Sequence, residues 1–380
     1  MLSQTFPRAP TIVGVLVRIV ENRMRMTRSH GSGSVAGSIK RVILRLDTDA
    51  GIAGYGEAAP WTVFSGTAEA AAAALHVHLR HVLTGRNAGH VAAIMRDCDA
   101  TLFGHPEAKA AVEMALYDIL GKALGMPAFV LLGGAARERI PLSFSLANPD
   151  LGADIATARA MYETGIRLFK VKTGFVEHRE DLQRLTTIRG SLPADIDLRI
   201  DYNQGLRPFD ALRRLQDLEQ FSATFIEQPL ERHLTRQMAE LTRALATPIL
   251  ADESVFSPED ALAGVACGVA DGFSVKLMKA GGFTKARAIA AIAQAAGLPC
   301  YGGTLWEGAI ALAAGAHLIA ATENISLGCE FYMPRYVFLP EELEAVLPLA
   351  GGQVEVPTGP GLGIAIDDSV IDRLTTARLQ

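Results

Sequence analysis

Two lysines flank one valine in the apolar run "RLFKVKTGF", at positions Lys170 and Lys172. Alternate side chains of an extended strand share a face, so both ammonium groups emerge on the same side. Lysine accounts for only 8 of the 36 basic residues, and a lysine amine, unlike the guanidinium of arginine, can be tuned toward neutral pH. Because like charges lower each other's pKa, we predict that Lys170 tunes and positions a partly neutral Lys172, which carries a proton.

Three carboxylates follow, each at the end of a short apolar run: Asp201, Glu227 and Asp252. One strand-helix unit separates each from the next, so the three side chains are expected to converge. Such carboxylates would repel each other strongly unless a cation joined them, and oxygen ligands select Mg²⁺ or Mn²⁺ over zinc. The alternative, an acid that caps the following helix, suits one such residue better than three in succession. Asn203 shares the face of Asp201 and is expected to support the site.

Lys276 follows the carboxylates, in "VKLMKAGG", and is therefore expected to lie across a closed barrel from Lys170 and Lys172. A substrate carboxylate bound to the metal would lie between these lysines, and its α-carbon could exchange a proton on either face. Glu330, in "LGCEF", would add an acid that orients the substrate or accepts a hydrogen bond from a lysine. For any single lysine, a charged end reaching solvent from the barrel edge is the alternative.

The elements that must position these groups form a repeat of short β-runs and helices that begins near residue 139. Its eight strand candidates are "IPLSFSLAN", "LFKVKTG", "DLRIDYN", "TFIEQP", "PILADES", "GFSVKLMKAGG", "LPCYGGT" and "ISLGCEF". Strands that alternate with helices pair in parallel, and eight units over roughly 200 residues favour a closed (β/α)8-type barrel over an open sheet. Catalytic groups of such barrels stand at the carboxyl ends of the strands, so the lysines and acids are expected at one mouth.

The part that precedes the barrel has a different pattern. Residues 10–60 alternate β-branched runs with turns, as in an antiparallel meander, and the alanine-rich segments that follow have helical spacing. The segment "VPTGPGLGIAIDD" is expected to return to this first domain. We therefore predict an α+β domain over residues 1–132, a barrel over 133–350 and a returning segment over 351–380.

Composition excludes several classes of protein. A chain of 380 residues with 49% hydrophobic content can bury a large core, and a net charge of -5 without a basic block gives no footprint for nucleic acid. No apolar run approaches the about 18 residues of a membrane span. Arg18 interrupts the apolar run near the N-terminus, which indicates a strand and not an export signal. A reducing cytoplasm fits the scattered cysteines, Cys98, Cys267, Cys300 and Cys329.

These motifs resemble the enolase superfamily, specifically its muconate-lactonizing-enzyme subgroup. The resemblance is carried by the KxK pair, "DYNQ", "IEQP", "ADES" and "VKLMKAGG", in this order and spacing, and it spans nearly the whole chain. It implies an N-terminal α+β capping domain and a modified TIM barrel, (β/α)7β. It also implies Mg²⁺ or Mn²⁺ at Asp201, Glu227 and Asp252, and proton transfer α to a carboxylate.

The segments "YGGTLWEGAI", "LGCEF" and "GPGLG" are most similar to lactonizing members of the subgroup. The implied activity, in aromatic catabolism, is the interconversion of a cis,cis-muconate-type dicarboxylate and muconolactone through an enolate, with Lys172 or Lys276 protonating the enolate carbon. Relatives commonly form homo-oligomers, often octamers. A racemase or epimerase of an amino-acid derivative is the nearest alternative, because lysines on both faces also permit 1,1-proton transfer. An acid dehydratase is a further alternative, whereas a non-enzymatic binding protein is disfavoured because no strand-end group is missing.

Two further elements are expected above the barrel mouth. The stretch "RSHGSGSVAG", residues 28–37, is rich in glycine and serine and is predicted to be a mobile flap that excludes water on closing. Its glycines lack the βαβ context of a nucleotide site. His30 in the flap is expected either to touch substrate or to be a solvated loop residue. Trp306 stands where the family usually has a smaller apolar residue and is expected at the substrate cavity.

Overall fold

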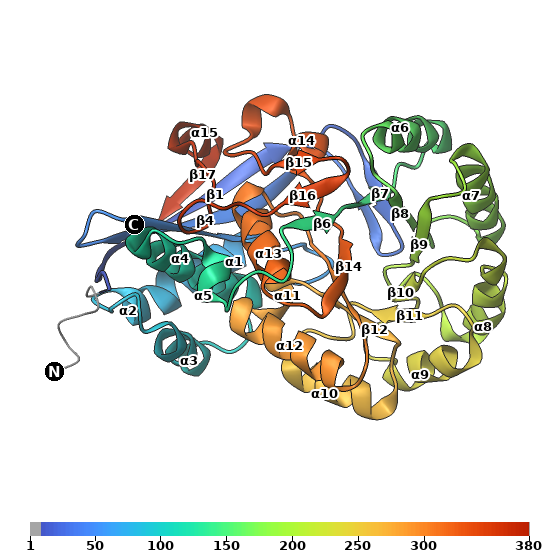
Figure 1. Ribbon diagram of the computed structural model, residues 1–380, viewed down its shortest axis with the longest axis horizontal. Helices are drawn as coiled ribbons and strands as arrows, with labels where there is room; N and C mark the ends of the chain where they lie inside the picture. Colours follow the sequence, from blue (N-terminus) through green and yellow to red (C-terminus); the bar gives the residue numbers. More distant parts are fainter. Residues whose placement is uncertain (1–8, 380) are drawn as a thin grey trace.

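The β-branched N-terminal runs form an antiparallel sheet in a computed structural model, which describes residues 9–379. Its strand order is β17-β1-β4-β5, and β17 pairs antiparallel with β1 although the two are far apart in sequence (Figure 1). Helix α4 packs on this sheet through β5, where a Cβ at Gly56 would collide with the carbonyl of Ala111, so the helix approaches the bare backbone. The four strands are β1 (Ile12–Arg23), β4 (Ser38–Thr48), β5 (Ala53–Ala58) and β17 (Thr375–Leu379).

The alanine-rich segments form the helices beside this sheet. Their small, regularly spaced apolar side chains pack with the inner residues of β1 and β4 into one core. These helices are α1 (Ala68–Ala73), η1 (Ala74–Leu79), α2 (Arg80–Leu83), α3 (Val91–Thr101) and α4 (Pro106–Leu124). The short helix α5 (Ala128–Leu131) follows them, and its Ala128 belongs to the core that includes the barrel.

The second part of the chain folds into the predicted barrel. Eight parallel strands follow one another in the order in which they occur in the sequence, and a parallel bridge between Leu142 and Cys329 joins the two ends of the sheet. The strands are β7 (Ser143–Leu146), β8 (Leu168–Lys172), β9 (Asp197–Asp201), β10 (Ile226–Glu227), β11 (Ile249–Ala251), β12 (Gly272–Val275), β13 (Cys300–Gly302) and β14 (Ile325–Cys329). The expected modified TIM barrel with an additional α+β part is confirmed.

Helices surround this barrel on the outside (Figure 1). They are α6 (Leu151–Glu163), α7 (His178–Ser191), α8 (Pro208–Gln216), α9 (Thr235–Ala244), α10 (Pro258–Cys267), α11 (Leu277–Ala280), α12 (Phe283–Ala295) and α13 (Ala309–Ala320). Every residue of α13 is buried, because this helix also contacts β5 and α5 of the first domain. Its sequence is accordingly apolar apart from His317, whose Nε2 lies 3.1 Å from the carbonyl oxygen of Leu362.

Short elements complete the fold. The hairpin of β2 (Arg28–His30) and β3 (Gly33–Val35) extends from the first domain and reaches beside β7 and β8 (Figure 1). The others are β6 (Arg139–Pro141), η2 (Glu219–Phe221), α14 (Pro334–Val337), η3 (Pro340–Glu342), β15 (Leu349–Ala350), β16 (Gln353–Glu355) and α15 (Asp368–Leu374).

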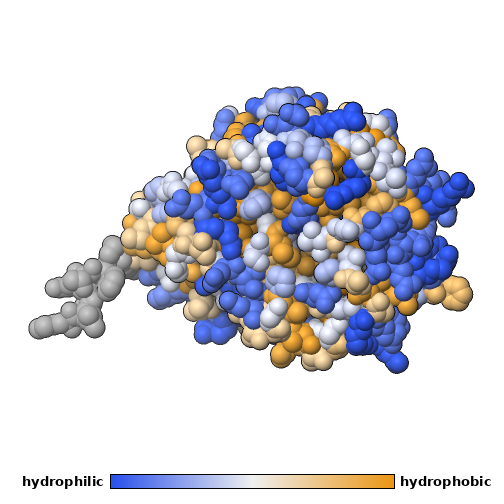
Figure 2. All heavy atoms as spheres, turned by 45° about the vertical axis from the view of Figure 1, so that its right-hand side comes forward, coloured by the Kyte–Doolittle hydropathy of each residue, from blue (hydrophilic) through white to orange (hydrophobic). Residues whose placement is uncertain are grey.

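The surface over the outer barrel helices is a mosaic in which hydrophilic residues predominate, with hydrophobic residues between them (Figure 2). The apolar residues of the barrel strands themselves are buried inside. Among the described residues, no helix has both the length and the apolar character needed to cross a membrane.

Candidate active site

Lys170 and Lys172 lie at the carboxyl end of β8. Both contact the same acidic cluster, as expected for two side chains on one face of a strand. They are 1% and 3% exposed. Parallel pairing places Lys172 opposite Asp201 on β9, and Asp201 opposite Glu227 on β10. The strand register therefore sets the charged groups of three neighbouring strands at one level of the barrel.

The ammonium of Lys170 lies at the centre of this acidic cluster. Its Nζ is 2.6 Å from Glu227 Oε2 and 3.1 Å from Asp201 Oδ2, and it also forms an ion pair with Glu330. Carboxylate oxygens of Asp201, Glu227 and Glu330 all lie within 4.8 Å of one another. Glu330, which follows β14, thus joins the acids from the opposite end of the strand order.

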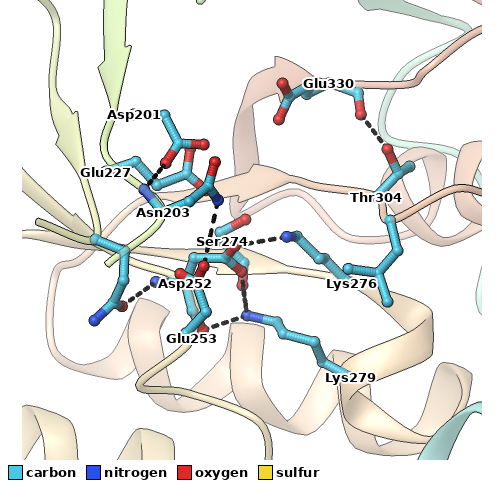
Figure 3. Close-up of polar contacts among 12 residues, drawn as sticks. Asp201, Asn203, Glu227, Asp252, Glu253, Ser274, Lys276, Lys279, Thr304 and Glu330 are labelled. Carbon is cyan, nitrogen blue, oxygen red and sulfur yellow. Dashed lines mark hydrogen bonds and ion pairs between the residues drawn. The ribbon is translucent and has the colours of Figure 1, made fainter. Parts of the chain in front are cut away.

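Asp252 is held differently from the other two acids of the predicted trio (Figure 3). Its two carboxylate oxygens accept hydrogen bonds from Lys276 Nζ at 2.6 Å and Lys279 Nζ at 2.7 Å. Its charge nevertheless lies close enough to contribute to the raised pKa of Glu227, which burial raises first, to about 7. Lys279 was not among the residues predicted from the sequence, although its place one helical turn after Lys276 was a usable signal.

The predicted lowering of the lysine pKa is wrong in this arrangement of side chains. Burial opposes the charge of Lys172, and Lys170 lowers its pKa further, but Asp201 and Glu330 outweigh both and the pKa is raised. Lys170 likewise has a pKa well above its ordinary value, because Glu227, Glu330 and Asp201 surround it. The sequence argument considered the adjacent ammonium groups and omitted the carboxylates that face them.

A further acid that the sequence reasoning missed lies beside this cluster. Glu253 is buried next to Asp252, and its Oε1 accepts a hydrogen bond from Asn203 Nδ2 at 3.3 Å (Figure 3). Burial, followed by the charges of Asp252 and Asp201, raises the pKa of Glu253 to about 8. Asn203 adopts a φ of 41°, a left-handed conformation that asparagine tolerates, and its backbone N–H donates to Asp201 at 2.8 Å.

The cluster fits a hard divalent cation. Several of its buried oxygens accept no hydrogen bond from any described residue: Glu227 Oε1, Glu330 Oε1, Asn203 Oδ1 and Glu253 Oε2. Unpartnered buried oxygens are costly unless an ion or another donor satisfies them, and a purely oxygen donor set suits Mg²⁺ or Mn²⁺.

His30 is the last residue of β2, in the hairpin of β2 and β3 that corresponds to the predicted flap, and its side chain is buried. The backbone N–H of Ser29 donates to the carbonyl of Ala147 in the barrel at 2.7 Å, so the hairpin is fastened to the loop after β7. His30 is 1% exposed, and its ring centroid lies 5.0 Å from that of Trp61 and 5.7 Å from that of Trp306. The alternative of a solvated loop histidine is therefore wrong.

Trp306 forms part of an aromatic cluster above the barrel. It stacks on Tyr332 with ring centroids 4.9 Å apart and meets Trp61 edge to face at 6.0 Å. A cavity of about 440 Å³ lies between the β2–β3 hairpin and residues 60–69, and Trp306 is the barrel residue that lines it. Trp61 was missed from the sequence, because nothing in "AAPWTVF" marks a residue that meets the barrel.

Three glycines let the hairpin approach the loops that carry the charged groups. A Cβ at Gly31 would collide with the carbonyl of Tyr202, and Gly31 also faces Gly205. Gly205 in turn packs on Gly174, two residues after Lys172. Backbone therefore meets backbone at this junction, and any side chain would hold the hairpin away from the barrel.

Asp181 supports the loop after β8 and is expected to make stability depend on pH. Its Oδ2 accepts a hydrogen bond from Gly174 N at 2.9 Å, and burial raises its pKa from 3.8 to about 7. The folded state therefore binds the proton more tightly than the unfolded state. The stability that this group contributes is fully present below about pH 4 and is lost as the pH rises through about 7.

We expect Asp181→Asn, which cannot ionise but can still accept the hydrogen bond, to raise the free energy of unfolding at pH 8 by about 1–3 kcal/mol. The gain should vanish toward pH 4. Urea unfolding at both pH values measures it, with Glu163→Gln, an exposed acid at the end of α6, as the control. An equal gain at both pH values would contradict the assignment.

Comparison with known proteins agrees with this geometry. A family profile described as "Mandelate racemase / muconate lactonizing enzyme, N-terminal domain" matches residues 15–133, and "Enolase C-terminal domain-like" matches residues 153–370. Muconate cycloisomerase 1 of Rhodococcus opacus is 33% identical, covering 96% of this chain and 98% of that protein. L-Ala-D/L-Glu epimerase of Bacillus subtilis (strain 168) is also 33% identical, over 85% of this chain and 88% of its own length.

Among solved structures, a muconate cycloisomerase from Azorhizobium caulinodans is 48% identical, with a TM-score of 0.86, covering 97% of this chain and 99% of that chain. Sequence and fold are thus shared over almost the full length. The chain belongs to the enolase superfamily, in its muconate-lactonizing-enzyme subgroup, and is an isomerase.

Proposed function

We propose that this isomerase is a metal-dependent cycloisomerase that interconverts a cis,cis-muconate-type dicarboxylate and the corresponding muconolactone. One observation carries the proposal: two buried lysines, Lys172 and Lys276, each contact a different acid of the predicted metal trio, Asp201 and Asp252 respectively. An acid bound at the cluster would therefore have an amine on either side. The similarity to lactonizing enzymes over nearly the whole chain supports the choice of substrate class.

We propose Asp201, Glu227 and Asp252 as the residues that hold Mg²⁺ or Mn²⁺. A bound divalent ion would supply positive charge that lowers the energy of the enolate formed at the substrate carboxylate. The three acids come from the ends of the adjacent strands β9, β10 and β11, which pair residue by residue. Glu330 is the competing third ligand, because its oxygens lie near those of Asp201 and Glu227.

The lysines would then carry the proton. In ring closure an oxygen of one substrate carboxylate bonds to the alkene carbon that is β to the other carboxylate. The π electrons of that alkene move toward the carbon α to this second carboxylate. The ammonium of Lys172 or Lys276 donates a proton to that carbon and becomes a neutral amine, which recovers the proton in the reverse direction. Lys170 would position Lys172 and the acids, because its Nζ contacts Asp201, Glu227 and Glu330.

His30 and Trp306 are proposed to meet the distal part of the substrate. Both ring nitrogens of His30 and Nε1 of Trp306 are buried without a hydrogen-bond partner among the described residues. Burial lowers the pKa of His30 well below its ordinary value, and the charge of Lys172 lowers it further. Asp201 also acts on the ring, so His30 lies near the charged cluster. Donors at this place suit the second carboxylate of a dicarboxylate.

Epimerisation of an amino-acid derivative is the second candidate. It is favoured by the 33% identity to L-Ala-D/L-Glu epimerase and by the lysines on both sides of the acidic cluster, which also permit removal and return of one α-proton. Both activities pass through an enolate of the substrate carboxylate and exchange a proton at its α-carbon. They differ in whether a carbon–oxygen bond forms.

Incubation in D₂O with Mn²⁺ distinguishes the two. With cis,cis-muconate, we expect a muconolactone that carries one deuterium at the α-carbon. With dipeptides or N-acyl amino acids, we expect no inversion at the stereocentre. Deuterium incorporation with inversion of such a substrate, and no lactone from muconate, would overturn the assignment in favour of the epimerase.

From the same resemblance we also propose a homo-oligomer, with an octamer as the expected size, a cytoplasmic location, and a division of the chain into residues 1–132, 133–350 and 351–380. Light scattering coupled to size-exclusion chromatography measures the first of these directly.

A further inference from the structure

A carboxylate of the first domain caps a helix of the barrel. Glu57, on β5, is fully buried, and its two oxygens accept hydrogen bonds from Gly308 N at 2.6 Å and Ala311 N at 3.0 Å. These N–H groups belong to the N-cap and the first turn of α13, where backbone donors have no partner within the helix. Gly308 has no side chain to serve them, so Glu57 does so from another domain.

Two further residues complete this cap. Arg41 Nη1 donates to Glu57 at 2.7 Å and to Glu344 at 3.2 Å, and Glu344 also accepts from Ala309 N at 3.1 Å. Arg41 is 1% exposed and Glu344 is 2% exposed, so the network is closed to water. Two buried acids against one arginine leave a negative charge, which the positive end of the α13 dipole stabilises.

The residues of the cap pack directly against the turn that leads into α13. A Cβ at Gly308 would collide with Arg41 Nη1 and would lie 2.5 Å from Glu344 Oε1. At the other end of the turn, Thr304 Oγ1 donates to the carbonyl of Glu330 at 2.6 Å. The turn of residues 304–308 is thus fastened to the first domain on one side and to the end of β14 on the other.

This turn carries Trp306 and adjoins a proposed catalytic lysine. A Cβ at Gly303, the residue before the turn, would lie 2.5 Å from Lys276 Cε. Glu307, within the turn, is close enough for its charge to interact with Lys276. A displacement of the turn would therefore move both the aromatic wall of the cavity and the surroundings of one amine.

We propose that Glu57 is a positioning residue of the active site: by capping α13 from the first domain it fixes the 304–308 turn, and with it Trp306, over the barrel mouth. The proposal rests on the proposed function only in assigning Trp306 to the substrate cavity. The placement of the turn itself has a separate readout, because the chain contains only 2 tryptophans, Trp61 and Trp306.

The structure offers a matched control. Glu113, on α4, is also a buried carboxylate of the first domain, and it accepts from Thr284 Oγ1 at 2.5 Å and Thr284 N at 3.2 Å in the first turn of α12. It therefore caps a barrel helix across the same domain boundary without contacting the 304–308 turn. If the only effect were a weaker contact between the two domains, Glu57→Gln and Glu113→Gln would change the protein's properties in the same way.

The test uses the full chain with Trp61→Phe, which leaves Trp306 as the single indole. Glu57→Gln removes the charge and places an amide donor against a backbone N–H, so we expect the Trp306 emission to shift to longer wavelength and acrylamide quenching to rise. Glu113→Gln should lower the thermal midpoint without either change. With Mn²⁺ and cis,cis-muconate, we expect Glu57→Gln to lower kcat/KM by about tenfold to a hundredfold, and Glu57→Asp to recover part of the emission and of the rate.

A Glu57→Gln protein that loses thermal stability while its Trp306 emission and quenching stay unchanged would overturn the proposal, because Glu57 would then be only structural. If Glu57→Gln does not fold, Glu344→Gln replaces it, since Glu344 accepts a hydrogen bond from Ala309 N at the start of the same helix, α13. An unchanged Trp306 signal would again overturn the proposal. Failure of the proposed function would appear separately, as absence of lactone formation by the parent protein with an intact fluorescence difference between Glu57→Gln and Glu113→Gln.

Discussion

Replacement of Lys172 by alanine is expected to lower kcat for lactone formation by about 10²–10⁴-fold, the range that a positioned proton donor contributes. Lys172 is buried and paired with Asp201, so a side chain at the protein surface cannot reach the position of its ammonium group and donate the proton instead. Lys276→Ala is expected to have an effect of the same order if both amines serve the reaction. Steady-state kinetics on the Mn²⁺-loaded protein measures both.

The two variants also report which amine faces the α-carbon. Exchange of the α-proton of muconolactone for deuterium in D₂O should be abolished by removal of the proton-carrying lysine and be slowed less by removal of the other. Lys285→Ala is the control, because Lys285 is 37% exposed and pairs with Asp99 away from the cluster. Retention of full activity in both Lys172→Ala and Lys276→Ala would refute acid–base catalysis by these residues.

Asp252→Asn is expected to weaken Mn²⁺ binding by more than about a hundredfold, beyond the loss that outer partners of a metal site cause. Replacing one of three anionic ligands by a neutral amide removes a negative charge and leaves a weaker oxygen donor, whereas Lys276 and Lys279 would remain and repel the cation. Calorimetric titration of the chelator-treated protein measures the affinity. Activity should disappear with the metal and return on its addition.

Glu330→Gln is the discriminating partner of this experiment. The oxygens of Glu330 lie as close to Asp201 and Glu227 as a third ligand requires, yet Lys170 and Lys172 both pair with this acid. If Asp252 is the ligand, Glu330→Gln should change Mn²⁺ affinity by less than about tenfold, the lower limit for outer partners. A large loss in Glu330→Gln with little loss in Asp252→Asn would reassign the site to Asp201, Glu227 and Glu330.

Much of the fold could be predicted because its signals are local and repeated. Each barrel strand is a short apolar run, and several of these runs end in a polar residue. Counting the strand-helix units therefore predicts the barrel. It also predicts that Lys172, Asp201 and Glu227 lie next to one another at the carboxyl ends of their strands. Parallel pairing then needs no further information, because consecutive strands are neighbours.

The remainder of the site depends on contacts between segments far apart in the chain. The carboxylates that hold the lysines charged include Glu330 from the last strand, and its approach to Lys170 follows only from closure of the barrel. Trp61 and Glu57 belong to the first domain and meet barrel residues across a boundary that no local pattern describes. A pKa depends on all of these neighbours at once, so an argument from two adjacent lysines was incomplete.

The pairing of β17 with β1 has a consequence for how the protein is made. Residues 375–379 supply one neighbour of β1, so that strand keeps an open edge on the ribosome until the whole barrel has been synthesised. Such a long-range closure is slow to form and leaves a template for pairing with other chains in the interval. Truncation just before residue 375 would therefore harm the yield of soluble protein more than its distance from the charged cluster suggests.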